Sequence, residues 1–128
     1  MKKKIFLACL IGILSLSSAY SYTGECKGGT IVAGFCKSNV QMNWWSAQAW
    51  CQANGSQLPT MYEMCPSWDG NGGAGKCPEL NKGLASQHVW SATAQDSIYA
   101  FTVDLLDGEV YPNARYYSMG VYGYAFCR

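Results

Sequence analysis

Residues 43–63 read NWWSAQAWCQANGSQLPTMYE and carry the clearest structural pattern in the chain. Trp44, Ala47 and Cys51 stand at positions i, i+3 and i+7, so an α-helix would place all three on one face. The sequence therefore predicts a short helix whose buried face includes a cysteine.

Local capping signals mark the ends of this helix and the start of a second one. Asn43 is the expected N-cap of the first helix, and Asn54-Gly55 its expected C-cap, because Gly tolerates the left-handed conformation that ends many helices. Thr60 and Glu63 have the spacing of a capping box, which predicts a second, short helix. Pro66 is expected to end it.

The N-terminus has the pattern of a secretory signal peptide. Three lysines at positions 2–4 precede an apolar run over residues 5–16, and Ser17 and Ala19 are the small residues that a cleavage site needs. The apolar run is too short for a transmembrane helix. We interpret residues 1–19 as a signal peptide, which would remove Cys9 and predicts an exported protein with no remaining membrane span.

The composition predicts one folded domain and excludes nucleic acid as a partner. Hydrophobic residues make up 49% of the chain and charged residues 13%, which is unlike a disordered protein. Loss of the signal peptide takes away three of the nine basic side chains, leaving six against eight acidic ones, a net charge of −2. Such a chain has no positive surplus to bind phosphates.

Six cysteines remain after the signal peptide, and their spacing alone allows several pairings in an oxidising compartment. A structural zinc site is the alternative, but zinc ligands typically stand about two to four residues apart. The closest intervals here are 10, 12 and 14 residues, and the chain has one histidine. Disulfides are therefore favoured. These cysteines are Cys26, Cys36, Cys51, Cys65, Cys77 and Cys127.

The rest of the chain predicts strands and loops. Residues 20–40 read as an N-terminal hairpin that a local disulfide fits, and residues 41–128 as the main domain. Residues 66–83 are rich in Gly and Pro and are expected to be irregular. From residue 88 onward the pattern indicates strands, with Asp107-Gly108 as a hairpin turn and residues 123–127 as the last strand.

Three acidic residues, Asp104, Asp107 and Glu109, cluster around that turn. A paired-carboxylate site for acid–base chemistry or a metal is one interpretation. We favour a polar turn with solvated charges on the strand face, because a strand's period of two places Asp104 beside no other acid.

The run from Trp44 through Cys51 to Leu58-Pro59-Thr60 and Glu63 resembles the first-helix signature of the C-type-lectin-like fold. The bacterial branch with LPT, as in Lcl C-terminal-like domains, is the most similar. Later segments agree, since residues 89–91 resemble the family's tryptophan-bearing strand and residues 126–128 its closing strand.

This resemblance covers about residues 40–128. It implies an α+β fold of two short helices, a small twisted antiparallel sheet and long irregular loops. It also implies that Cys51 pairs with Cys127, with Cys26–Cys36 and Cys65–Cys77 as local bridges.

The chain departs from the family's calcium and enzyme motifs. Neither the acid- or amide-Pro-Asn tripeptide nor the Trp-Asn-Asp strand is present. Asp69, Asn71 and Glu79 could supply oxygens, but their spacing does not fit a calcium loop. The lone His88 has no catalytic partner in the sequence. We therefore predict no metal, no other cofactor and no enzymatic activity.

The C-terminal tail is the predicted binding surface. Tyr, Ser, Gly and Asn crowd together there, and these residue types dominate evolved binding loops. The tail also resembles that of receptor-binding proteins diversified by retroelements, in which a Gly-x-Val turn, an Arg and a closing strand frame the variable positions. Core packing on a shared strand face is the alternative for Tyr122, Tyr124 and Phe126. The predicted ligand-binding residues are Tyr111, Asn113, Tyr116, Tyr117, Ser118 and Tyr122.

Together these patterns predict an exported binding protein, located in the periplasm, at the cell surface or in the medium, that recognises a protein or glycan. The alternatives are a calcium-dependent glycan-binding lectin and a structural accessory of a surface or pilus-like assembly.

Overall fold

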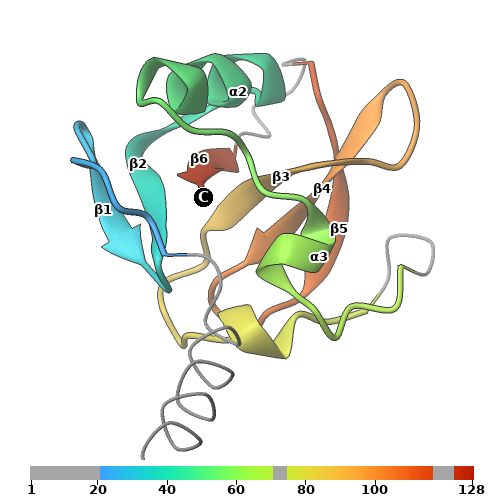
Figure 1. Cartoon of the computed structure of the whole chain (residues 1–128). Coiled ribbons are helices and arrows are strands. Elements are labelled where there is room, and N and C mark those ends of the chain that lie inside the picture. The colour runs from blue at the N-terminus through green and yellow to red at the C-terminus, as the bar shows by residue number, and fades with distance from the viewer. Residues whose placement is uncertain (1–20, 71–74, 117–122) are drawn as a thin grey trace, which may run out of the picture.

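The computed structural model describes residues 21–70, 75–116 and 123–128 (Figure 1). The predicted signal peptide lies outside these residues, as do Tyr117, Ser118 and Tyr122. The described chain is α+β, and no helix in it is long and apolar enough to cross a membrane. Its elements in chain order are β1 (Gly29–Val32), β2 (Phe35–Met42), α2 (Trp44–Ala53), α3 (Met61–Met64), the 3-10 helix η1 (Pro78–Leu80), β3 (His88–Ala94), β4 (Tyr99–Asp104), β5 (Val110–Ala114) and β6 (Gly123–Cys127).

One six-stranded sheet, in the order β1-β2-β6-β3-β4-β5, forms the centre of the fold (Figure 1). The predicted antiparallel sheet is wrong at one pair, because β3 and β6 run parallel at Val89 and Tyr124. The last strand enters between β2 and β3 and runs antiparallel to β2. That insertion sets β6 parallel to β3, so the sheet is mixed.

The predicted hairpin is present as β1 and β2, which turn at Ala33 and Gly34, both with positive φ. β2 then pairs with β6 at Cys36–Cys127 and Lys37–Phe126. The hairpin therefore belongs to the same sheet as the strands of the main domain.

Helix α2 covers one face of the sheet and confirms the predicted pattern. The side chain of Asn43 caps it by accepting a hydrogen bond from the amide of Ser46 at 2.8 Å. Trp44, Ala47 and Cys51 are its buried residues, and they pack against sheet residues that include Trp90. The helix ends at Asn54, where Gly55 takes a φ of 74°.

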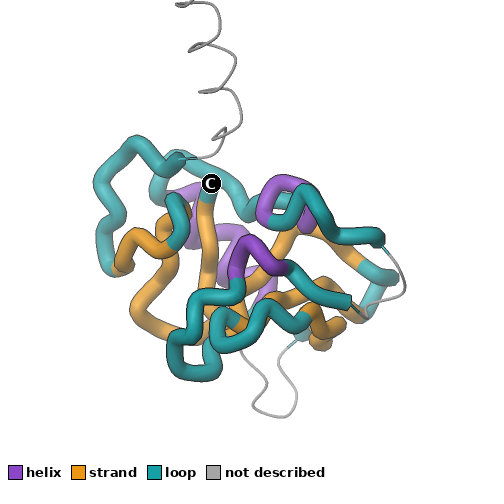
Figure 2. The backbone as a smooth tube through the Cα atoms, turned by 90° about the horizontal axis from the view of Figure 1, so that it is seen from below, coloured by secondary structure: helices purple, strands orange, loops and turns teal. Residues whose placement is uncertain are grey.

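The opposite face of the sheet is covered by α3 and by loops, which form a large share of the chain (Figure 2). Both bonds of the predicted capping box between Thr60 and Glu63 are present at the start of α3. Met61 and Met64 from this helix are buried with Phe101 and Phe126 from the sheet. The sheet is thus a central layer with an apolar core on each side.

Three disulfides tie these layers together and match the pairing that the family resemblance implies. Cys26 bonds Cys36, Cys51 bonds Cys127, and Cys65 bonds Cys77. The second bridge joins α2 to β6 across 76 residues of sequence. Disulfides form and persist in oxidising compartments, and three of them in one small domain agree with such a location.

The predicted turn at Asp107-Gly108 connects β4 and β5, which pair in an antiparallel ladder. Gly108 has a φ of 76°, and a Cβ atom there would collide with the carbonyl oxygen of Cys77. Glycine is therefore required both by backbone conformation and by the close approach of the irregular loop.

Candidate recognition surface

Two of the predicted binding residues, Tyr111 and Asn113, lie on strand β5 rather than in the loop expected from the sequence. In the β4–β5 ladder Tyr111 pairs with Thr102 and Asn113 with Ala100. Ala100 packs with residues of α2, so both side chains lie on the side of the sheet that carries this helix. The sequence predicted a loop here because Pro112 stands in this segment, and proline usually interrupts strands. β5 is the edge strand of the sheet, where a residue without an N–H donor is tolerated.

Asn113 is anchored by a buried hydroxyl group. Its amide nitrogen donates to the Thr102 hydroxyl at 2.7 Å, and that hydroxyl donates to the carbonyl oxygen of Tyr111 at 3.2 Å. Tyr111 is 38% exposed, and its ring lies 5.2 Å from the His88 ring. Burial and the nearby acidic groups raise the pKa of Tyr111, so its phenol stays protonated and able to donate a hydrogen bond.

His88 has partners that the sequence did not reveal. Its Nδ1 lies 3.3 Å from the Thr102 hydroxyl, and its Nε2 lies 3.7 Å from a carboxylate oxygen of Asp104. Hydroxyl, imidazole and carboxylate stand in the order of a nucleophilic triad. Thr102, however, is fully buried and its hydroxyl is held by Tyr111 and Asn113. The arrangement therefore serves to fix β3, β4 and β5 together.

The solvated position expected for Asp104 is wrong, because its side chain is only 8% exposed. Its carboxylate accepts hydrogen bonds from the Gln87 amide at 3.1 Å, the Leu106 amide at 3.0 Å and the Ser86 hydroxyl at 2.7 Å. Burial acts to raise the pKa of Asp104, but these hydrogen bonds and the nearby His88 outweigh it and hold the pKa below its usual value. The buried carboxylate therefore joins the segment before β3, at residues 86–87, to the start of the turn that follows β4.

A stability measurement against pH tests this role of Asp104. Because its folded-state pKa is lowered, the stability it contributes is complete above its unfolded pKa of about 3.9 and is lost as the pH falls through the folded value. We expect Asp104→Asn to cost about 1–3 kcal/mol at pH 7, the usual worth of buried bonds to a charged group. Urea unfolding from pH 7 to pH 2 should show the gap between wild type and variant closing below pH of about 4. A gap that is constant with pH would contradict the assignment.

The other two acids of the predicted cluster have separate roles. Glu109 forms an ion pair with Lys76 at 3.5 Å, and Asp107 accepts a hydrogen bond from the Glu109 amide at 3.0 Å. The three carboxylates are therefore not gathered into one acid–base or metal site.

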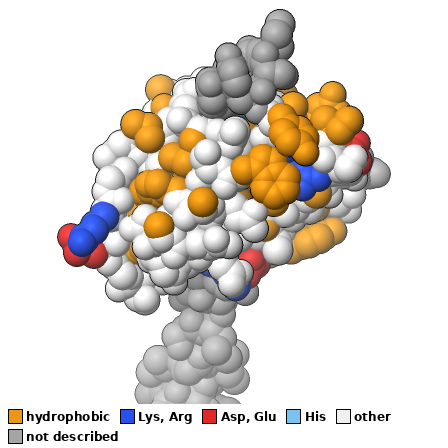
Figure 3. Space-filling model, turned by 90° about the horizontal axis from the view of Figure 1, so that it is seen from above, with side chains coloured by type: hydrophobic (Ala, Val, Ile, Leu, Met, Phe, Trp, Pro, Cys, Tyr) orange, Lys and Arg blue, Asp and Glu red, His pale blue; other side chains and the backbone are white. Residues whose placement is uncertain are grey.

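An exposed aromatic group lies where β5 ends and α2 begins. Tyr116 is 58% exposed, and its ring centroid lies 6.2 Å from that of Trp45, which is 47% exposed. The guanidinium of Arg115 lies 5.0 Å from the Trp44 ring and 5.7 Å from the Trp45 ring, within the range of cation–π attraction. In Figure 3 hydrophobic side chains gather around a basic side chain on this face of the molecule.

Arg115 is held firmly in this group. It donates from Nη2 to the carbonyl oxygen of Asp96 at 2.8 Å, and its own carbonyl oxygen accepts from the Trp44 amide at 3.3 Å. Its Nε is buried and has no hydrogen-bond partner among the described residues. We call the five residues Trp45, Tyr111, Asn113, Arg115 and Tyr116 the recognition surface.

Trp45 and Arg115 belong to this surface but were not among the binding residues predicted from the sequence. The adjacent pair Trp44-Trp45 was the available signal, because neighbouring residues on a helix point about 100° apart, so Trp45 stands away from the face that Trp44, Ala47 and Cys51 share. Trp44 is buried and donates from its indole nitrogen to the Ser91 carbonyl oxygen at 2.9 Å, so Trp45 is the outward one.

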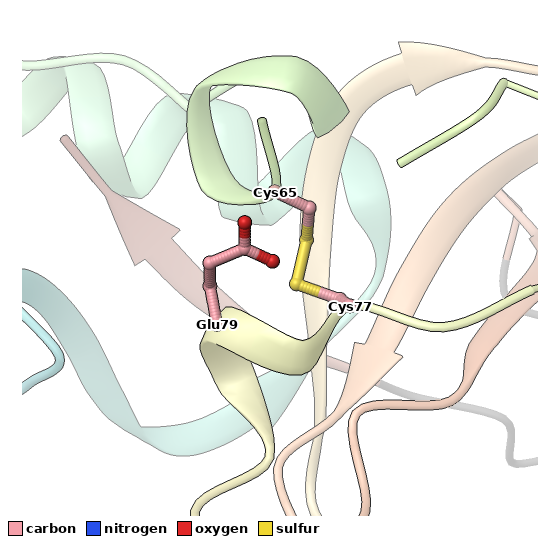
Figure 4. Close-up of side chains that lie close together, drawn as sticks. All are labelled: Cys65, Cys77 and Glu79. Carbon is pink, nitrogen blue, oxygen red and sulfur yellow. A yellow bond between two sulfur atoms is a disulfide. The ribbon is translucent and has the colours of Figure 1, made fainter. Parts of the chain in front are cut away.

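A group of possible metal ligands lies elsewhere, at Cys65, Cys77 and Glu79 (Figure 4). The two sulfur atoms are bonded to each other, so neither is available as a thiolate ligand. Burial acts to raise the pKa of Glu79, but hydrogen bonds to its carboxylate, including two groups of Ser67, hold the pKa below its usual value. This carboxylate caps the loop beside the disulfide. Asn71, its suggested calcium co-ligand, lies outside the described residues.

Comparison with protein-family models and with curated proteins found no match to this chain. The C-type-lectin-like resemblance therefore stands as an interpretation of the sequence, beside an α+β fold with three disulfides that the structure contains.

Proposed function

We propose that this chain is an exported, non-catalytic binding protein of the C-type-lectin-like type, which recognises a protein or carbohydrate ligand through its recognition surface. One observation carries the proposal. The exposed rings of Trp45 and Tyr116 lie beside each other at the end of β5, and the half-buried Arg115 lies over the Trp45 ring, on the same side of the sheet as Tyr111 and Asn113.

These residue types are the ones that dominate binding energy at interfaces. Trp, Tyr and Arg are enriched among hot-spot residues, because they offer large contact areas together with a polar group. Cation–π contacts with the two indoles and the hydrogen bond to the Asp96 carbonyl oxygen restrict Arg115 before any ligand arrives. Such preorganisation lowers the entropy cost of binding.

The finer parts of the proposal have their own support. The signal-peptide pattern of residues 1–19 and the three disulfides favour export. The Cys51–Cys127 bridge, the buried face of α2 and the buried Trp90 on β3 agree with the lectin-like resemblance. The buried, occupied hydroxyl of Thr102 favours recognition over catalysis.

The test is a binding screen with the processed, disulfide-bonded protein on a glycan array and on a displayed peptide library. We expect at least one reproducible ligand, whose affinity falls about 10- to 100-fold in Trp45→Ala/Tyr116→Ala, the loss expected for two hot-spot aromatics. The matched control is Tyr62→Ala, which removes an aromatic ring that is 55% exposed on α3, away from this surface.

Two results would sink the proposal: no ligand in either library, or an equal loss of binding in Tyr62→Ala. Loss of binding in a calcium chelator would instead support the calcium-dependent lectin. Circular dichroism of each variant shows that the fold is retained.

A further inference from the structure

Two pockets, of about 390 Å³ beside the chain's C-terminal residue and about 380 Å³ beside α3, open widely to solvent. A third pocket, which α2 forms with β3, is less open. This third pocket has a volume of about 260 Å³. Its lining residues are Trp44, Gln48, Gln52, Gln57, Leu58 and Ala92.

Three carboxamides and three apolar side chains make up this lining. Gln48 and Gln52 stand one turn apart on α2, and residues at this spacing share a helix face. Gln57 comes from the segment after α2, and its side-chain oxygen accepts a hydrogen bond from Arg128 at 3.3 Å. Among the described residues that line the pocket, none carries a charge.

The walls of the pocket are fixed by contacts within the fold. The indole of Trp44 is bonded to the Ser91 carbonyl oxygen, and the amide of Ala92 donates to the Pro59 carbonyl oxygen at 2.7 Å. Leu58 is only 4% exposed. The apolar wall of the pocket is therefore in place before a ligand enters it.

We propose that this pocket binds one uncharged sugar ring. Each carboxamide supplies both hydrogen-bond donors and an acceptor, which matches the hydroxyl groups of a pyranose. Trp44, Leu58 and Ala92 offer an apolar wall for the C–H face of the ring. None of the described residues that line the pocket is a cation, and Arg128 beside Gln57 is already paired with Glu63, so a carboxylate or phosphate would be desolvated here without a free cation and acidic sugars are disfavoured.

A peptide strand fits this location poorly. Strand β3 pairs with β4 on one side and with β6 at Val89 on the other, and at the pocket the amide of Ala92 already donates to the Pro59 carbonyl oxygen, so this amide is not available to an added strand. The small volume of about 260 Å³ also suits a single ring better than an extended chain.

This pocket is distinct from the recognition surface, and its proposal does not depend on the proposed function. Its amides come from the second and third turns of α2 and from Gln57, whereas the recognition surface lies at the start of α2 and along β5.

The experiment is a titration of the ¹⁵N-labelled, disulfide-bonded protein, followed through the side-chain amide signals of its glutamines. The neutral probes are the methyl glycosides of glucose, galactose, mannose and N-acetylglucosamine; the acidic probes are glucuronic acid and glucose 6-phosphate. We expect at least one neutral probe to shift the signals of Gln48 and Gln52 saturably, and the acidic probes to bind at least about tenfold more weakly.

Variants identify the pocket as the source of binding. Gln48→Leu/Gln52→Leu keeps strong helix formers on α2, and we expect it to weaken binding about tenfold or more through the loss of two amide contacts. Gln87→Leu, whose side chain lies outside the pocket, should leave binding unchanged. No saturable shift with any neutral probe, equal binding of the acids, or an equal loss in Gln87→Leu would overturn the proposal.

Discussion

Replacing both Cys51 and Cys127 by Ala is expected to lower the free energy of unfolding by about 4 kcal/mol, because this bridge closes the longest loop in the unfolded chain. The two residues are 76 positions apart and both are fully buried. Their bridge holds α2 against β6, a strand inside the sheet rather than at its edge. A small domain has a total stability of about 5–15 kcal/mol, so this loss removes a large part of it.

The matched control is Cys26→Ala/Cys36→Ala, in which the bridged residues are only 10 positions apart. The same entropy argument gives this bridge less than about 3 kcal/mol. Urea unfolding of both variants, with the remaining disulfides verified by mass spectrometry, measures the difference. Equal losses would contradict the role assigned to the long bridge.

Trp90→Ala is expected to have a similarly large effect, about 3–5 kcal/mol, the range for truncating a buried aromatic side chain. Trp90 is fully buried on β3, and its indole nitrogen donates to the Met42 carbonyl oxygen at 2.9 Å. A Cβ atom on Gly123 would lie 2.8 Å from that nitrogen, so the start of β6 packs directly on the indole. One side chain thus fixes the relative position of β2, β3 and β6.

Two further variants separate burial from hydrogen bonding at this position. Trp90→Phe keeps most of the apolar volume but loses the bond to Met42, and we expect it to cost about 1–3 kcal/mol. Trp45→Ala removes the same side chain from an exposed position and should cost no more than about 1 kcal/mol. Denaturant unfolding followed by near-ultraviolet circular dichroism ranks the three. A Trp45→Ala loss as large as that of Trp90→Ala would refute this account.

The helices could be predicted from the sequence because their signals are local. Asn43 caps α2 through an amide three residues away, and Thr60 and Glu63 cap each other over the same distance. The turn at Gly108 is likewise a short-range feature. Each of these contacts forms without reference to distant parts of the chain.

The candidate site was predicted less completely, because it depends on contacts between residues far apart in the sequence. Tyr111 and Asn113 were expected at the surface of a loop, but only the place of β5 at the sheet edge makes a strand containing Pro112 acceptable. The contact of Arg115 with Trp45 joins residues 70 positions apart. No spacing rule connects them, because the two meet only after α2 has packed on the sheet.

Sequence by itself determined the two capped helices, the turn at Asp107-Gly108 and, through a family resemblance, the pairing of six cysteines. Tertiary structure alone decided the parallel contact of β6 with β3, the burial of Asp104 and the cation–π contacts of Arg115 with two indoles. The physical reason is the separation of the interacting groups along the sequence, because the hydrogen bonds of caps and turns join residues only a few positions apart. Strand order and buried charges depend on which distant groups remain to be covered or paired once the layers have packed.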